Sequence, residues 1–238
     1  MDESVLTITY VFTFSGNREE SFEIRLDPET IEAVDPLPDA LPDWTQLEFH
    51  KCVHCPLNSD KHSHCPLAAR ISGIVDRFTE IISYQEIRVA VKTAERIVLK
   101  ETTAQVGLSA LLGLVMATSA CPVLSKLKSQ AYFHLPFATI EESIMRTVSS
   151  YLLKQYFLER EGYDPDWELK ELNRYYQILQ EVNISLKKRI DVASLNDANM
   201  NAVSSLGMLS IAVSFSLEDQ LEEIRDTFLR ETPTESLP

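Results

Sequence analysis

The chain has few glycines, only six in 238 residues. None of them belongs to a glycine-rich loop of the kind that wraps phosphate groups in nucleotide-binding proteins. The serine-nucleophile pattern G-x-S-x-G and the zinc-protease pattern H-E-x-x-H are absent as well. The sequence therefore lacks the signatures of three large enzyme classes, and it favours a protein that is not an enzyme.

Basic residues are also scarce. The 22 Lys and Arg residues are set against 36 Asp and Glu residues, which makes the formal net charge −14. Nucleic acids and anionic membrane surfaces both bind clustered Lys and Arg. We therefore expect neither nucleic acid nor a membrane as a partner, and a protein partner is left open.

The N-terminus, M-D-E-S-V-L-T-I-T-Y, has no basic region followed by an apolar core. Such a pattern would mark a signal peptide. We therefore expect a cytoplasmic location, where thiols stay reduced. Cysteines in that compartment indicate metal or redox chemistry more than structural disulfides.

One uncharged segment, 104–125, approaches the length of a membrane-spanning helix. Its strongly apolar part is shorter, and the segment also contains Gln105, Ser109 and the pair Cys121 and Pro122. We predict a buried core helix here, with a membrane helix as the weaker alternative.

Two β-hairpins are predicted in the first half of the chain. Apolar residues alternate over 5–14 and again over 22–26, with the turn sequence S-G-N-R following the first run. The pattern recurs over 87–91 and 97–99. Apolar residues at helical spacing predict a helix between the hairpins, from Pro66 to about Ser83.

The chain after residue 103 is predicted to be a bundle of about five helices, one of them opened by a capping box of Thr139 and Glu142. The fold class is therefore α+β. We expect a single domain over 1–238, with a sheet-containing part over 1–103, a helical part over 104–230 and a frayed tail over 231–238.

Four cysteines are the most informative residues that the chain contains. Cys52, Cys55 and Cys65 lie in one short stretch, Cys121 follows later, and all but Cys52 are followed directly by proline. A Cys-x-x-Cys pair places two sulfurs on one turn, and thiolates are the ligands of tetrahedral zinc sites and of iron–sulfur clusters. The sequence predicts a metal centre held by these four residues, with zinc and a [4Fe-4S] cluster undecided.

Other interpretations of the cysteines stay open. An iron–sulfur cluster would suit an electron-transfer or redox-sensing protein. The pair Cys52 and Cys55 could instead serve a thiol oxidoreductase, and Cys65 and Cys121 could be small buried apolar residues.

Histidines crowd the same segment, and any of them could replace a cysteine as a ligand. Four thiolates already fill a tetrahedral shell, so we predict that these histidines belong to a solvated polar loop. They are His50, His54, His62 and His64.

Four stretches of this sequence together resemble a bacterial protein family classed only as a domain of unknown function. They are W-T-Q-L-E-F-H-K-C-V-H-C-P-L, H-C-P-L-A, G-L-V-M-A-T-S-A-C-P and F-H-L-P-F-A. The resemblance covers nearly the whole chain, implies one continuous domain and treats the four cysteines as a set. It brings no activity, substrate or partner. We therefore expect a cytoplasmic bacterial protein with a metal centre and a binding or regulatory role.

Overall fold

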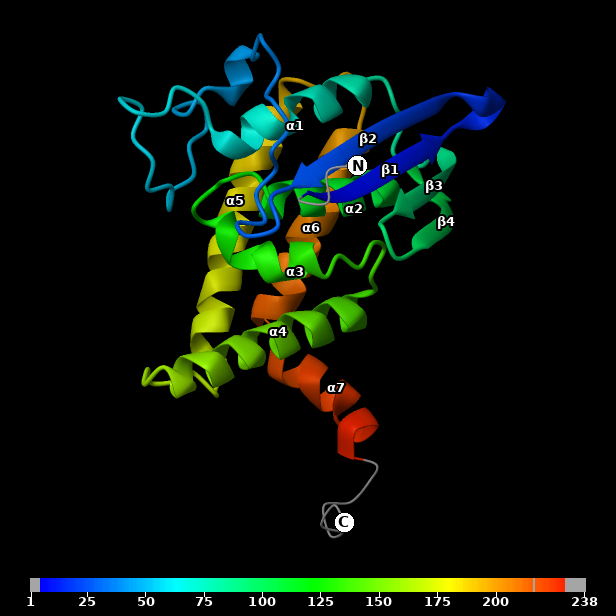
Figure 1. Ribbon diagram of the computed structural model, residues 1–238. Coiled ribbons are helices and arrows are strands. Elements are labelled where there is room, and N and C mark those ends of the chain that lie inside the picture. The colour runs from blue at the N-terminus through cyan, green and yellow to red at the C-terminus, as the bar shows by residue number, and fades with distance from the viewer. Residues whose placement is uncertain (1–4, 216, 230–238) are drawn as a thin grey trace. The chain divides into compact units, whose positions relative to one another are not determined.

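The computed structural model describes residues 5–215 and 217–229. These residues form an α+β fold with a four-stranded antiparallel sheet and seven α-helices (Figure 1). The chain divides into two compact units, one made of Met1–Phe137 and Leu179–Gly207 and the other of Ala138–Ile178 and Met208–Pro238. The single-domain organisation stays a prediction, and the tail predicted over 231–238 lies outside the described residues.

Both predicted hairpins are confirmed, and they join into one sheet. The strands are β1 (Leu6–Thr13), β2 (Glu19–Leu26), β3 (Glu86–Lys92) and β4 (Ile97–Thr103). Their order is β2-β1-β3-β4, with every neighbouring pair antiparallel. The hairpins therefore meet through β1 and β3, and β2 is an edge strand.

One face of the sheet carries an aromatic core. Phe12 on β1 lies opposite Val89 on β3, and both side chains are fully buried. The ring of Phe78 packs edge-on against Phe12, with 5.1 Å between the ring centroids, and also contacts Phe22 on β2. This core results from the alternation of side chains along each strand, which places every second residue on the same face.

Helices α1 (Pro66–Arg77) and α2 (Ala104–Ala117) cover this face. Helix α2 comes so close that a Cβ atom on Gly107 would lie 2.9 Å from the side chain of Val89 and 3.0 Å from that of Phe12. A larger residue at this position would push the helix away from the sheet. Glycine therefore permits the close packing of α2 on the core.

The uncharged segment forms α2, and most of that helix is buried, as predicted for a core helix. The helix stops before Cys121 and Pro122, where the side chains of Thr118 and Ser119 bond back to carbonyl oxygens of the last turn. No single described helix is long and apolar enough to cross a membrane, and α6 and α7 reach that length and composition only as a bent pair.

Helix α1 ends at Arg77, earlier than predicted, because the next residues bond to a distant segment instead of continuing the helix. The carbonyl of Thr79 accepts from the backbone N–H of Asn196 at 2.9 Å, and the backbone N–H of Ser83 donates to the carboxylate of Asp197 at 2.8 Å. Sequence periodicity cannot detect such partners.

The remaining helices follow the predicted order, apart from the short helix α3, which was not predicted. The box of Thr139 and Glu142 is formed by two hydrogen bonds of 2.7 and 3.1 Å at the start of α4. The bounds are α3 (Lys128–Tyr132), α4 (Ile140–Arg160), α5 (Lys170–Asp191), α6 (Ala198–Phe215) and α7 (Leu217–Leu229).

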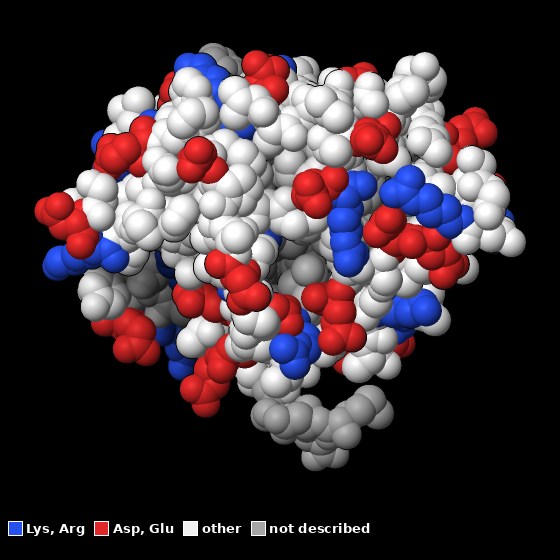
Figure 2. Space-filling model, turned by 90° about the horizontal axis from the view of Figure 1, so that it is seen from above, with Lys and Arg blue, Asp and Glu red and all other residues white. Residues whose placement is uncertain are grey.

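Charges of both signs are interspersed on the surface. On the face shown in Figure 2, acidic side chains are widely spread and basic side chains lie beside them. Two such neighbours are Arg25 with Asp35, whose atoms are 2.7 Å apart, and Arg88 with Glu101, at 2.8 Å. Such pairing disperses the positive charge instead of gathering it into one field.

Candidate metal centre

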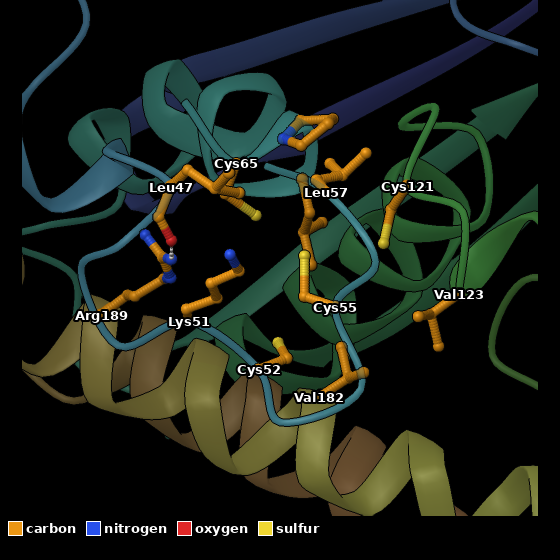
Figure 3. Close-up of a pocket in the computed structure, with 12 residues that line it drawn as sticks. Leu47, Lys51, Cys52, Cys55, Leu57, Cys65, Cys121, Val123, Val182 and Arg189 are labelled. Atoms are coloured by element: carbon orange, nitrogen blue, oxygen red, sulfur yellow. Dashed lines mark hydrogen bonds between the residues drawn. The ribbon is translucent and has the colours of Figure 1, made fainter. Parts of the chain in front are cut away.

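Three separate stretches of the chain bring the four cysteines to one cavity (Figure 3). Cys52 and Cys55 lie on one loop, where the backbone N–H of Cys55 donates to the carbonyl of Cys52 at 3.0 Å and closes a tight turn. Cys65 directly precedes α1, and Cys121 follows the end of α2. All four line the cavity, together with apolar side chains that include Leu47, Leu57, Val123 and Val182.

The loop is closed at its base by an extended pairing of two short segments. Gln46 forms an isolated antiparallel bridge with His64. The backbone N–H of Cys65 donates to the carbonyl of Thr45 at 2.8 Å, and the side chain of Thr45 hydrogen-bonds the ring of His64 at 2.8 Å. These contacts place Cys65 next to the segment that leads into the Cys52 turn.

Arg189 on α5 holds the same base from the other side. Its guanidinium, on a residue only 2% exposed, donates to the carbonyl oxygens of Trp44 at 2.7 Å, Gln46 at 2.8 Å and Leu47 at 3.0 Å. Three charge-assisted hydrogen bonds to carbonyls within residues 44–47 hold both this segment and the guanidinium in place. Arg189 thus forms a rigid, positively charged wall of the cavity.

Sequence reasoning missed Arg189 and the second cation of the cavity, Lys51. Lys51 forms an ion pair with Glu48 at 3.0 Å. One signal could have identified Arg189: it lies three residues after Leu186 and seven after Val182, which places it on the buried face of its helix. A basic residue at such a position needs partners, and only the fold shows which ones.

Burial raises the pKa of two of the thiols, Cys52 and Cys121. It raises the pKa of Cys52 to about 11, and the nearby cysteines act in the same direction, while a hydrogen bond with Ser185 lowers the pKa. Burial also raises the pKa of Cys121, against hydrogen bonds from the backbone of Leu124 and Val123. Without a cation in the cavity, the Cys52 thiol therefore stays protonated at neutral pH.

The same burial acts on the guanidinium of Arg189 in the opposite direction, because its charged form is the protonated one. Burial lowers the pKa of Arg189, while the proximity of Cys65, Cys52 and Cys55 raises it. Negative charge on those sulfurs would therefore be stabilised by Arg189.

The cavity is small, with a volume of about 20 Å³. That is room for roughly one water molecule, or for a single ion of similar size. The four cysteines are free thiols. Within 5–215 and 217–229, however, no group of three or more His, Cys, Asp or Glu side chains is arranged so that it could hold a metal ion. The structure gathers the thiols around one space without forming a coordination shell.

The histidines that could have replaced a cysteine as a ligand do not line this cavity. Among the described residues that form its wall, there is no histidine. His64 is engaged with Thr45, and the ring of His50 packs against Phe49 with 4.7 Å between centroids. The donor set that faces the space consists of the four thiols.

The comparisons with known proteins identify the family alone. No curated protein and no solved structure matches the chain. The family model described as Domain of unknown function (DUF6901) matches residues 8–229, which confirms the resemblance seen in the sequence and leaves the cysteine pattern to be tested by experiment. Because this match covers far more than half of its length, the chain belongs to the family Domain of unknown function (DUF6901).

Proposed function

We propose that Cys52, Cys55, Cys65 and Cys121 bind one zinc ion, and that the protein is a binding or regulatory protein in which this ion is mainly structural. The observation that carries the proposal is the presence of four thiols from three separate stretches around one cavity. An ion bound there would join the loop before α1 to the segment after α2.

Zinc fits the chemistry of these residues. Zinc binds thiolate sulfur at about 2.3 Å in a tetrahedral shell, which corresponds to about 3.8 Å between sulfurs. The four side chains would have to move closer together on binding, because as placed they form no coordination group. Binding would replace the thiol protons, so affinity should rise with pH.

Arg189 supports the same proposal. Four thiolates around one zinc ion leave the site with a net negative charge, and the guanidinium of Arg189 already lies in the cavity wall. It is positioned by three backbone carbonyls rather than by a carboxylate. Its positive charge therefore remains to balance the site.

Two alternatives rank below zinc. A [4Fe-4S] cluster has the right ligands, but its eight atoms need far more space than about 20 Å³. A thiol oxidoreductase needs a nucleophile with a lowered pKa. The pKa of Cys52 is instead raised to about 11.

Elemental analysis and a visible spectrum of protein purified without oxygen test the proposal directly. We expect one equivalent of zinc per chain and a colourless protein. A brown protein that contains iron, with an absorption that bleaches on reduction, would show that the cysteines bind an iron–sulfur cluster instead of zinc. Protein without any bound metal, even after incubation with zinc, would refute both.

Single substitutions then test the ligand set. Cys52→Ser and Cys121→Ser should each lower zinc affinity at least tenfold and lower the thermal stability of the zinc-loaded protein. His62→Ala is the matched control, since His62 lies on the same loop but not in the cavity wall. Unchanged metal content in both cysteine variants would remove the proposal.

A further inference from the structure

A second, larger cavity lies in the same unit, away from the cysteines. It is a groove of about 320 Å³ between strand β2 and helix α1. The floor and walls come from three places: residues 21–24 of the strand, one side of the helix, and the segment 33–38. A volume of this size suits a small or short ligand.

The strand contributes an open backbone edge to this groove. In an antiparallel pair, residues alternate between bonding to the partner strand and pointing their N–H and C=O groups outward. The hairpin bond from the N–H of Phe14 to the carbonyl of Arg18 shows that even-numbered residues of β2 bond to β1. Ser21, Glu23 and Arg25 therefore direct their backbone groups to the free edge.

Two of these three residues are already partnered. The carbonyl of Arg25 accepts from the backbone N–H of Val34 at 2.9 Å, and its N–H donates to the carboxylate of Asp35 at 3.0 Å. At the other end, the carbonyl of Ser21 accepts from Arg77 at 2.9 Å. Between them, the N–H and C=O of Glu23 have no partner among the described residues. One donor and one acceptor thus remain open at the centre of the edge.

The helix contributes positive charge. Arg70 donates to the backbone carbonyls of Asp35 and Ala33, and it forms an ion pair with no carboxylate in the part of the chain that the structure describes. The carboxylate of Asp35 is held by Arg25 at 2.7 Å instead. Asp35 is near enough to attract Arg70, but its carboxylate is paired with Arg25, so the Arg70 guanidinium can still attract an anion in the groove.

The second arginine lies two turns further along α1. Arg77 packs over the ring of Phe22, with 4.9 Å from the guanidinium carbon to the centroid, and is 3.6 Å from Glu20. Gly73 lies between the two arginines in the sequence and lines the groove, and a Cβ atom there would meet nothing within 4 Å. The groove is therefore open beside Gly73, between the positions of the two arginines along the helix.

We propose that this groove binds a short extended peptide segment that carries a carboxylate. Its backbone would pair with the N–H and C=O of Glu23 as an added strand, which is an established mode of peptide recognition. Its carboxylate would lie near Arg70 and Arg77, and its apolar side chains would face Ile24 and Ile74. Between Ser21 and Arg25, whose outward backbone groups already have partners, the free edge of β2 has room for about three peptide residues at about 3.3 Å per residue. The proposal is independent of the metal centre.

Nuclear magnetic resonance of the ¹⁵N-labelled full-length protein tests the proposal, with N-acetyl-trivaline as the probe. We expect the largest shifts at the amides of Glu23 and Gly73. The same tripeptide with an amidated C-terminus should bind at least tenfold more weakly, because it lacks the carboxylate. Equal binding of both probes, or no shift at Glu23 at millimolar concentration, would overturn the proposal. Acetate with the same affinity as the tripeptide would also overturn it, since the groove would then bind only charge.

Three variants separate binding from folding. Gly73→Leu should fill the groove and lower affinity at least tenfold, whereas Gly73→Ala, the matched control, should retain binding because a Cβ atom fits there. Both should fold, as judged by circular dichroism. Glu23→Pro removes the open N–H at an edge position, where proline is tolerated, and should also lower affinity at least tenfold. Wild-type affinity in both Gly73→Leu and Glu23→Pro would exclude the groove as the site.

Discussion

The aromatic core and the cysteine cavity belong to the same compact unit, but they are stabilised by different interactions. In the core, the rings of Phe12, Phe22 and Phe78 pack against each other and against apolar side chains from both hairpins. Around the cavity, the buried Arg189 donates to backbone carbonyls, and the backbone N–H groups of Cys55 and Cys65 donate to carbonyls of the same loop region. The core is stabilised by its own apolar contacts, whereas the stability of the cavity region would depend on a ligand if the proposed ion binds there.

This difference has a thermodynamic consequence. Burial of apolar area stabilises the core whatever solutes are present. A bound ion stabilises the native state by an amount that rises with the logarithm of its concentration relative to its dissociation constant, and this stabilisation vanishes when the ion is removed. The two regions should therefore respond differently to chelators, and substitutions in each region can separate them.

The largest expected effect belongs to the core. Phe12→Ala should lower the free energy of unfolding by about 3–5 kcal/mol, because it leaves a cavity beneath the sheet in contact with Gly107 of α2. Urea denaturation with and without a chelator measures this loss. We expect the same loss in both conditions. A much smaller loss in the presence of chelator would show that the core and the cavity are not independent.

An intermediate effect is expected at the base of the cavity. Arg189→Lys keeps the charge but cannot satisfy the carbonyls of Trp44, Gln46 and Leu47 together, so it should cost about 1–3 kcal/mol of unfolding free energy. It should also weaken zinc binding less than Arg189→Met does, since only the second variant removes the charge. Denaturation and metal titration of both variants provide the measurement. Equal zinc affinity in the two would contradict a role for the charge.

The smallest effect concerns a polar link beside the core. Hydrogen bonds from Ser83 lower the pKa of Asp197 below its ordinary value. The folded state therefore binds that proton less readily than the unfolded state, so the contribution to stability is present above the ordinary pKa and is lost as pH falls through the folded one. Melting temperatures from about pH 6 to about pH 2 should show a shallower acid slope for Asp197→Asn. Parallel curves for the two proteins would contradict this assignment.

The sequence-based predictions agree with the structure where the interactions involved are local in the sequence, and fail where they join distant residues. Alternation over 5–14 and 22–26 predicts a hairpin correctly, because successive side chains of a strand point to opposite faces of the sheet and the pattern is visible in adjacent residues. The capping box of Thr139 and Glu142 is local for the same reason. The early end of α1 was missed because its cause, the pairing of Thr79 and Ser83 with Asn196 and Asp197, comes from more than a hundred residues away.

The candidate sites show the same limit. The Cys-x-x-Cys turn could be predicted from the spacing of Cys52 and Cys55. The role of Arg189 in the cavity wall could not be predicted, because the sequence does not show whether a basic residue in a helix is buried and bonded to backbone or exposed to solvent. The open edge at Glu23 depends on which strands pair, and on which of its neighbours are capped.

The amino-acid sequence by itself determined the strands, most helices, the acidic charge and the family, because periodicity, caps and composition are properties of adjacent residues. Only the tertiary structure decided that β1 and β3 join the hairpins, that Cys121 reaches the cavity lined by the other three cysteines, and that α1 leaves a groove beside β2. These features depend on which distant segments pack together, and that choice is made by the burial of the whole unit rather than by any local pattern.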